Sequence, residues 1–254
     1  MVYFKAKCQL GNLMLEYAAA ISLCKAGEMP AVIAGDERSL KIIKGNQELF
    51  GKPIIYRIVP VNAHYWKESQ VPYVEIPKRA GDIVLDGVFF SEKYFNKDLV
   101  CARYSPTLKI VGHLNGKYGD WLRRPEVTGI HVRRGDYMMC QFDFPFVGRN
   151  YYKSAVSRLD GCDDFIVCSD DIEWCKRFFP QAFPNKRFLF SEWNTPLEDM
   201  YLLSLCQNNI SSNGSFAWWA AWLNSNPSKR VLAPSMWFGF AVPKERVNPK
   251  DILF

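Results

Sequence analysis

From residue 126 onward, the chain alternates between short β-rich runs and helical stretches. Two parallel strands need a long crossover connection, which is usually a helix. The alternation therefore predicts a doubly wound α/β sheet. We expect strands at 128–132, 165–169, 187–190, 209–211 and 230–233, and helices at 151–159, 171–179, 196–207 and 215–224.

The first half of the chain is less regular, and the sequence between Asn62 and Arg124 shows no clear element order. Glycine, proline and charged residues gather at 116–125, which marks a domain boundary. We therefore predict two α/β domains, 1–124 and 125–254, that face one another across a cleft. Within the first, we expect strands at 2–7, 31–34, 54–58 and 83–88, and a helix at 12–26 closed by Gly27.

The composition indicates a globular protein but leaves the kind of ligand open. Hydrophobic residues make up 48% of the chain and charged residues 23%, which is typical of a globular protein. No run is apolar enough for a membrane span and the start lacks a signal peptide, so we expect a cytoplasmic protein with at most peripheral contact at the inner face of the membrane. The net charge of +6 suits an anionic ligand, a nucleic acid or an anionic membrane.

Eight cysteines are scattered without a CxxC pair or a histidine at zinc-ligand spacing. We interpret them as reduced packing residues. Two formal glycosylation sequons, at Asn209 and Asn213, are interpreted as coincidence in a chain expected to stay in the cytoplasm.

The most informative segment is an apolar strand that ends in His131-Val-Arg-Arg-Gly-Asp136. Ligands of doubly wound folds bind beyond the carboxyl ends of strands. Arg133 can offer a planar fork of donors to a phosphate, and Asp136 is close enough in sequence to hold a guanidinium. The alternative is a surface Arg–Asp pair, and a lone histidine such as His131 is more often a core residue than a catalyst.

A second segment, Ser211 to Leu223, passes from a short strand through small polar residues into an apolar helix. Backbone NH groups at a helix start, serine hydroxyls and Gly214, which allows close approach, make a natural phosphate seat. The three tryptophans of this helix are assigned to packing.

A third strand ends in Asp170-Asp171. A carboxylate here can accept hydrogen bonds from the N1 and N2 edge of guanine. Alternatively, Asp170 caps the following helix, which is the commoner role for such a residue. The two carboxylates are adjacent rather than spaced as Asp-x-Asp, so no metal site is predicted.

Together these motifs resemble the α-1,2-fucosyltransferases of glycosyltransferase family 11, whose bacterial members carry a His-x-Arg-Arg-x-Asp strand tip and a Ser-Ser-Phe-x-Trp-Trp-x-Ala-Trp-Leu helix start. Here the counterparts are 131–136 and 212–223. Further stretches agree near Gly11-Asn12, Asp199-Met200 and 231–238. Members usually continue the first of these as Gly-Asn-Gln-Met-Phe-Gln-Tyr, whereas this chain has Glu16 in place of the second Gln, and they usually have Ser at the position of Gly214.

The resemblance implies a GT-B fold with the donor in the C-terminal domain. It also implies transfer of L-fucose from GDP-fucose to a galactose hydroxyl of a glycan, with inversion and without a metal or other cofactor. Arg133 would contact the β-phosphate, and Ser215 and the amide of Phe216 would hold the diphosphate. Asp170, or Asp171 as the alternate, would read guanine, and Gly11 and Asn12 would lie by the reacting sugar.

For the chemistry, we expect Arg133, Ser215 and the Phe216 amide to stabilise charge on the leaving β-phosphate, while Asp136 fixes the arginines and Arg134 is secondary. His131 is included among the donor-site residues, and Glu16 and Asp136 are candidates for the general base. Two alternatives are a protein O-fucosyltransferase-like enzyme and a non-catalytic module that binds a nucleotide sugar or a nucleic acid. The chain lacks an RNA-binding signature, so no nucleic-acid partner is expected.

Overall fold

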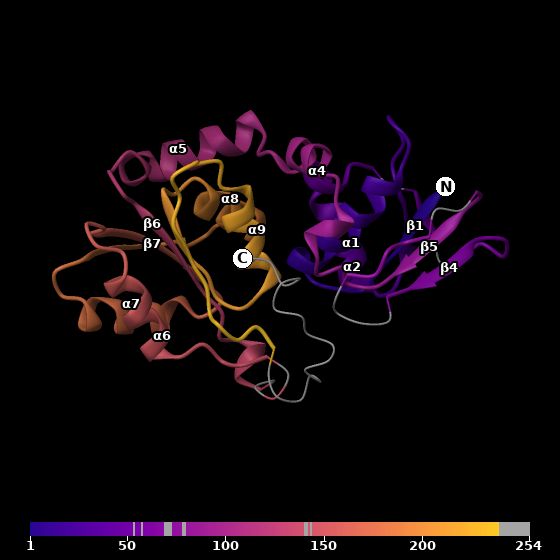
Figure 1. Cartoon of the computed structure of the whole chain (residues 1–254). Helices are drawn as coiled ribbons and strands as arrows, with labels where there is room; N and C mark the ends of the chain where they lie inside the picture. Colours follow the sequence, from indigo (N-terminus) through magenta and orange to yellow (C-terminus); the bar gives the residue numbers. More distant parts are fainter. Residues whose placement is uncertain are drawn as a thin grey trace. The chain divides into compact units, whose positions relative to one another are not determined.

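The computed structural model describes residues 1–52, 54–56, 58–68, 73–77, 80–139, 142 and 144–238. The chain forms two compact units, one of Met1–Ser105 and one that begins at Pro106. Each unit holds a five-stranded sheet (Figure 1), and every strand pair in both sheets is parallel. The predicted α/β class is confirmed.

The sheet of the first unit has the order β3-β2-β1-β5-β4. Its strands are β1 (Val2–Ala6), β2 (Ala31–Ala34), β3 (Ile55–Tyr56), β4 (His64–Lys67) and β5 (Ile83–Asp86). Its helices are α1 (Leu10–Leu23), α2 (Glu37–Gly45), α3 (Gln47–Phe50), the 3-10 turn η1 (Glu92–Tyr94) and α4 (Lys97–Tyr104). The central helix α1 is buried along most of its length, and the Tyr104 hydroxyl of α4 donates to the Met14 carbonyl at 2.7 Å.

Two expectations for this region are corrected. Helix α1 ends at Leu23 rather than residue 26, and Gly27 lies in the turn that follows, with a φ of +82° and a hydrogen bond from Glu28 N to Lys25 O. The division after Ser105 assigns α5 (Leu108–Leu122) to the second unit, whereas the boundary was expected near residue 124. The glycines that suggested that boundary lie inside α5, where Gly116 is exposed and Gly119 is buried.

The sheet of the second unit has the order β10-β9-β6-β7-β8. Its strands are β6 (Thr128–Val132), β7 (Asp164–Ser169), β8 (Arg187–Phe190), β9 (Asn208–Ile210) and β10 (Val231–Leu232). After α5 come the 3-10 turn η2 (Asp136–Met138), α6 (Arg149–Ser157), α7 (Ile172–Ala182), α8 (Pro196–Ser204) and α9 (Ser215–Leu223). Every strand and helix expected after residue 126 is present, with ends that differ by a few residues. Helix α8 begins with a capping box formed by Thr195 and Glu198.

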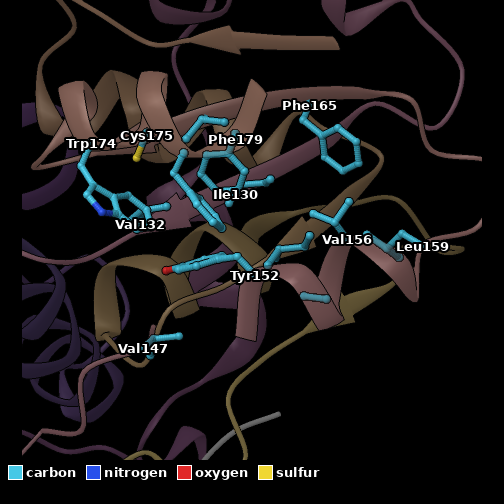
Figure 2. Packing of buried hydrophobic residues seen from close by; sticks show 14 of the residues in the cluster. Ile130, Val132, Val147, Tyr152, Val156, Leu159, Phe165, Trp174, Cys175 and Phe179 are labelled. Atoms are coloured by element: carbon cyan, nitrogen blue, oxygen red, sulfur yellow. The ribbon is translucent and has the colours of Figure 1, made fainter. Parts of the chain in front are cut away.

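The two faces of this sheet are covered by different helices. Ile130 and Val132 of β6 pack with α6 and α7, and Figure 2 shows them beside Tyr152 and Trp174. Gly129, on the opposite face, has no room for a side chain, because a Cβ there would lie 2.9 Å from the Leu203 Cδ2 of α8. The side chain of His131 points to this second face as well, since side chains alternate along a strand.

Candidate functional site

The order of the second sheet places a topological switch at β6. The chain runs from β6 to β7 and β8 on one side, and later to β9 and β10 on the other. Ligands of doubly wound sheets bind in the crevice outside the carboxyl ends of the strands at such a switch. The segments that follow β6 and β9, with Arg133 and Ser215, therefore lie at the expected position of a ligand.

Arg133 is held by two carboxylates. Its Nη2 lies 2.7 Å from Asp136 Oδ1, and its Nη1 lies 2.9 Å from Asp170 Oδ2. A guanidinium has five N–H donors, so these two contacts leave donors for a third, anionic partner. With its side chain 26% exposed, Arg133 is both fixed and accessible.

Arg134 is the more enclosed of the two arginines. Its Nε lies 2.9 Å from Asp171 Oδ2, and its guanidinium carbon lies 4.2 Å from the centre of the Trp174 ring. Its backbone N donates to Asp170 Oδ1 at 2.9 Å. These contacts tie the end of β6 to the end of β7.

The close approach of these two strand ends requires glycine at position 135. A Cβ on Gly135 would lie 2.6 Å from Asp170 Oδ2, which is a clash. Any other residue here would push Asp170 away from Arg133.

The structure corrects the capping role that was the alternative for Asp170. Asp171, not Asp170, caps α7, because its Oδ1 accepts from Trp174 N at 3.1 Å. Asp170 is engaged with Arg133 and the Arg134 amide instead. Whether either residue also reads guanine stays a prediction.

His131 is buried and joins β6 to the segment after β9. Its Nδ1 lies 2.8 Å from Ser212 Oγ, and its ring centre is 5.0 Å from that of Phe216. Burial, together with the nearby charge of Arg133, lowers the pKa of His131 to about 3. A neutral imidazole can position the segment before α9, but it cannot supply a positive charge near neutral pH.

Helix α9 begins at Ser215, directly after this segment, and its N-cap residue Gly214 has no side chain to cap it. The backbone of Gly214 is extended, and a Cβ there would lie 3.6 Å from Tyr137 Oη, an ordinary contact. The surrounding protein therefore leaves room for a side chain at this position, and the role of Gly214 in allowing close approach of a phosphate stays a prediction.

Asn213 holds the same segment from the other side. Its Nδ2 donates to Pro145 O at 2.8 Å, and its backbone carbonyl accepts from Tyr137 Oη at 3.2 Å. Among the described residues, its buried Oδ1 has no hydrogen-bond partner. Both sequon asparagines, Asn209 and Asn213, are buried, so neither is accessible for glycosylation.

Sequence reasoning missed Ser212, Tyr137 and Asn213 as parts of this site. Each acts through contacts between segments distant along the chain, the spacing being 81 residues for His131 and Ser212. A signal was present in the small polar run before α9, which was interpreted only as a phosphate seat.

Gly11, Asn12 and Glu16 belong to the first unit. Gly11 and Asn12 lie in the first turn of α1 rather than in a turn before it, because the helix begins at Leu10. Glu16, one turn further, is fully buried, and among the residues that the structure describes neither of its carboxylate oxygens has a hydrogen-bond partner of good geometry. A side chain in this position cannot meet an acceptor hydroxyl in this conformation, which disfavours Glu16 as a general base. The place of Gly11 and Asn12 by the reacting sugar stays a prediction.

Among the described residues, no group of three or more His, Cys, Asp or Glu side chains could hold a metal ion. No helix in that part of the chain is both long and apolar enough to cross a membrane.

The family model described as glycosyl transferase family 11 matches residues 2–239. The chain belongs to glycosyl transferase family 11. An alpha-1,2-colitosyltransferase of Escherichia coli is 31% identical over 185 residues, which covers 67% of this chain and 60% of that protein. The galactoside 2-alpha-L-fucosyltransferase SEC1 of Bos taurus is 28% identical over 241 residues, or 86% of this chain and 63% of that protein. The chain thus spans less than two thirds of the length of these family 11 relatives.

The fold is shared with a crystal structure of NodZ alpha-1,6-fucosyltransferase soaked with GDP-fucose. The TM-score is 0.57 with 13% sequence identity, and the match covers 89% of this chain and 96% of that chain. A likeness at this identity concerns the fold alone. The predicted GT-B type, with two Rossmann-like units, is confirmed for this family 11 chain.

Proposed function

We propose that this family 11 protein is an inverting fucosyltransferase that moves L-fucose from GDP-β-L-fucose to a galactose hydroxyl of a glycan. The observation that carries the proposal is Arg133, fixed by Asp136 and Asp170 at the tip of β6. The names of the relatives support the reaction class, since they transfer colitosyl or fucosyl groups and one acts on galactosides.

In the reaction, the acceptor oxygen forms a bond to the anomeric carbon of fucose while the bond to the β-phosphate oxygen breaks. GDP leaves with the electron pair, so negative charge grows on the β-phosphate. The remaining N–H donors of Arg133 and the amides of the first turn of α9, at Ser215 and Phe216, are suited to stabilise that charge. Because the carboxylates already fix Arg133, little ordering is needed during the reaction.

Asp136 combines two proposed roles. It orients Arg133, and with a side chain 51% exposed it is the better placed of the two general-base candidates. The acceptor proton would pass to this carboxylate or to water. Arg134 supports the site through its bonds to Asp171, which hold the end of β7 in place.

No metal or other cofactor enters this proposal. Asp170 and Asp171 are each paired with an arginine, so both carboxylates near the proposed diphosphate site are already engaged. We propose that the second unit binds the donor and the first takes part in binding the acceptor. A cytoplasmic location is supported by the described cysteines, which are all free.

The test is to incubate the full chain with GDP-fucose and a panel of galactosides, lactose first, and to analyse products by mass spectrometry. We expect a fucosylated disaccharide extended at the galactose. A further incubation with a protein acceptor tests the alternative that the chain is a protein O-fucosyltransferase-like enzyme. GDP binding without any transferred sugar would instead favour the non-catalytic alternative.

A further inference from the structure

Trp193, in the loop between β8 and α8, has an unusual exposure and an unusual backbone conformation. It is 96% exposed, and its φ of +62° is in the left-handed region. That conformation is uncommon for any residue except glycine and is an outlier for a bulky one. A strained and fully exposed tryptophan contributes little to the stability of the fold, so its presence points to a ligand.

Hydrogen bonds and an ion pair hold both chain neighbours of Trp193 in place. Lys117 Nζ donates to Glu192 O at 2.6 Å and to Asn194 Oδ1 at 2.8 Å. Lys176 Nζ lies 2.7 Å from Glu192 Oε1, and Asn194 Nδ2 donates to Asp199 Oδ1 at 3.0 Å. The indole is thus presented from a loop that is already ordered before any ligand arrives.

This loop follows the carboxyl end of β8, beside the end of β7. Val167 of β7 pairs with Phe190 of β8, and Ser191 N donates to the Val167 carbonyl at 2.8 Å. Neighbouring strands lie about 4.8 Å apart. The loop that carries Trp193 therefore begins at the ligand-binding edge of the sheet, next to the end of β7.

In dinucleotide-binding sheets of this topology, the phosphates sit at the first strand and the nucleoside extends toward the end of the second. The counterparts here are β6, with Arg133, and β7, with Asp170 and Asp171. A base that continues in this direction reaches the end of β8. Aromatic side chains bind nucleobases there by stacking on their flat faces.

We propose that Trp193 is a stacking platform for the guanine base of the donor. This inference rests on the proposed function, because it takes the donor to be a guanine nucleotide. The indole covers one face of the base, while the diphosphate is bound at the tip of β6.

The experiment is calorimetric titration of the full chain with GDP and with inorganic pyrophosphate, which has no base. Trp193→Ala should weaken GDP binding by roughly 5- to 100-fold, the range expected for loss of one stacked base, and leave pyrophosphate binding within about twofold. Trp193→Phe keeps a ring and should retain most of the GDP affinity. Leu108→Ala, a change at another exposed apolar side chain of the same unit, is the matched control and should alter neither titration.

Trp193→Gly adds a second readout. Glycine relieves the left-handed strain, so the melting temperature should not fall and is expected to rise, while GDP affinity drops as in the alanine variant. The inference is overturned if Trp193→Ala binds GDP within twofold of the parent chain, or if GDP and pyrophosphate weaken by the same factor. A parent chain that does not bind GDP would overturn the proposed function itself.

Discussion

The carboxyl edges of the two sheets hold charge in different ways. In the second unit, Arg133 at the end of β6 is shared between Asp136 and Asp170, and all three side chains are partly exposed. In the first unit, Lys5 lies in β1 and Lys7 directly follows that strand. Both lysines pair with Asp86 at the end of β5, whose side chain is only 6% exposed.

This difference indicates that the carboxyl edge of the second sheet is the one suited to bind an anion. Among the described residues, the two ion pairs of Arg133 use two of its five N–H donors, whereas Lys5 and Lys7 both pair with the buried carboxylate of Asp86, and Lys5 also donates to Tyr65 Oη at 2.8 Å. Burial would raise the pKa of Asp86, but hydrogen bonds from Lys7, Tyr65 and Lys5 outweigh it and lower the pKa to about 2. Nearby, burial raises the pKa of Glu16 well above its usual range, and the Cys8 thiol and the charge of Lys7 offset only part of that effect.

The largest expected effect is that of Arg133→Lys. Lysine keeps the charge but loses the planar fork, so it cannot serve two carboxylates and a phosphate together. We expect turnover with GDP-fucose to fall by about a hundredfold or more, with a smaller change in donor binding, as for loss of a transition-state donor. Steady-state kinetics and calorimetry measure the two effects.

Two matched variants sharpen this prediction. Arg134→Lys should retain a substantial part of the activity, and Lys5→Arg, the reverse exchange on the edge of the first unit, should change turnover little. Equal activity of Arg133→Lys and Arg134→Lys, or near-native turnover of Arg133→Lys, would show that the tip of β6 is a structural Arg–Asp pair.

Glu16→Gln tests the edge of the first unit. A carboxyl group whose pKa is raised by folding stabilises the fold below its unfolded pKa, near 4.3, and that stability is lost as the pH rises through the folded pKa. The glutamine variant should therefore match the parent near pH 4 and be more stable by as much as about 5 kcal/mol near pH 9, since folding raises the pKa of Glu16 to about 8 and one pKa unit corresponds to about 1.4 kcal/mol. Urea denaturation across this range measures the difference.

Asp86→Asn is the control with the opposite sign. The pKa of Asp86 is lowered by its donors, so its contribution is present at neutral pH and is lost only as the pH falls toward 2. This variant should be less stable than the parent at pH 7. If Glu16→Gln and the parent lose stability in parallel between pH 4 and pH 9, Glu16 is not buried in solution.

Asp170→Asn separates the two roles given to that residue. Asn weakens the bonds to Arg133 and to the Arg134 amide, so we expect turnover to fall about tenfold, as for the loss of one charged hydrogen bond. Because Asp170 is predicted to read guanine, we also expect affinity to fall more for GDP than for UDP, whereas an equal loss would leave only its contacts to the arginines. Calorimetry with both nucleotides is the measurement. A loss confined to GDP would support the guanine-reading role predicted from the sequence.

The second unit was largely predictable because its strands are short apolar runs that end abruptly in polar residues. The predicted bounds of β6 and β8 match the structure. Helix α5 was not predictable, because Gly112, Gly116 and Gly119 resemble punctuation although they lie within one continuous helix. The local sequence pattern indicates which secondary structure a segment can form, whereas packing determines whether glycines are tolerated within it.

The site was predictable in its residue types but not in its pairings. The sequence suggested a cap at Asp170 as one alternative, yet the cap is Asp171, because Arg133 and the Arg134 amide engage Asp170. That competition arises between two strand ends 36 residues apart in the chain. Sequence alone could not rank these partners, since ranking them requires the register of β6 and β7.

The smallest expected effect distinguishes the two glycines of the site. Gly214→Ser introduces a residue that can cap α9, its backbone is extended, and a Cβ meets only an ordinary contact. We expect stability to rise by a few tenths of a kcal/mol and GDP affinity to stay within about twofold. Gly135→Ser should instead reduce turnover, because its Cβ would displace Asp170 from Arg133. Thermal unfolding, GDP titration and turnover with GDP-fucose, each for both variants, measure these effects. The contrary outcome is a loss of GDP affinity in Gly214→Ser as large as the loss of turnover in Gly135→Ser. In that case the first turn of α9 binds the phosphate more closely than a serine side chain allows. Glycine at position 214 would then be a requirement of the ligand rather than of the fold.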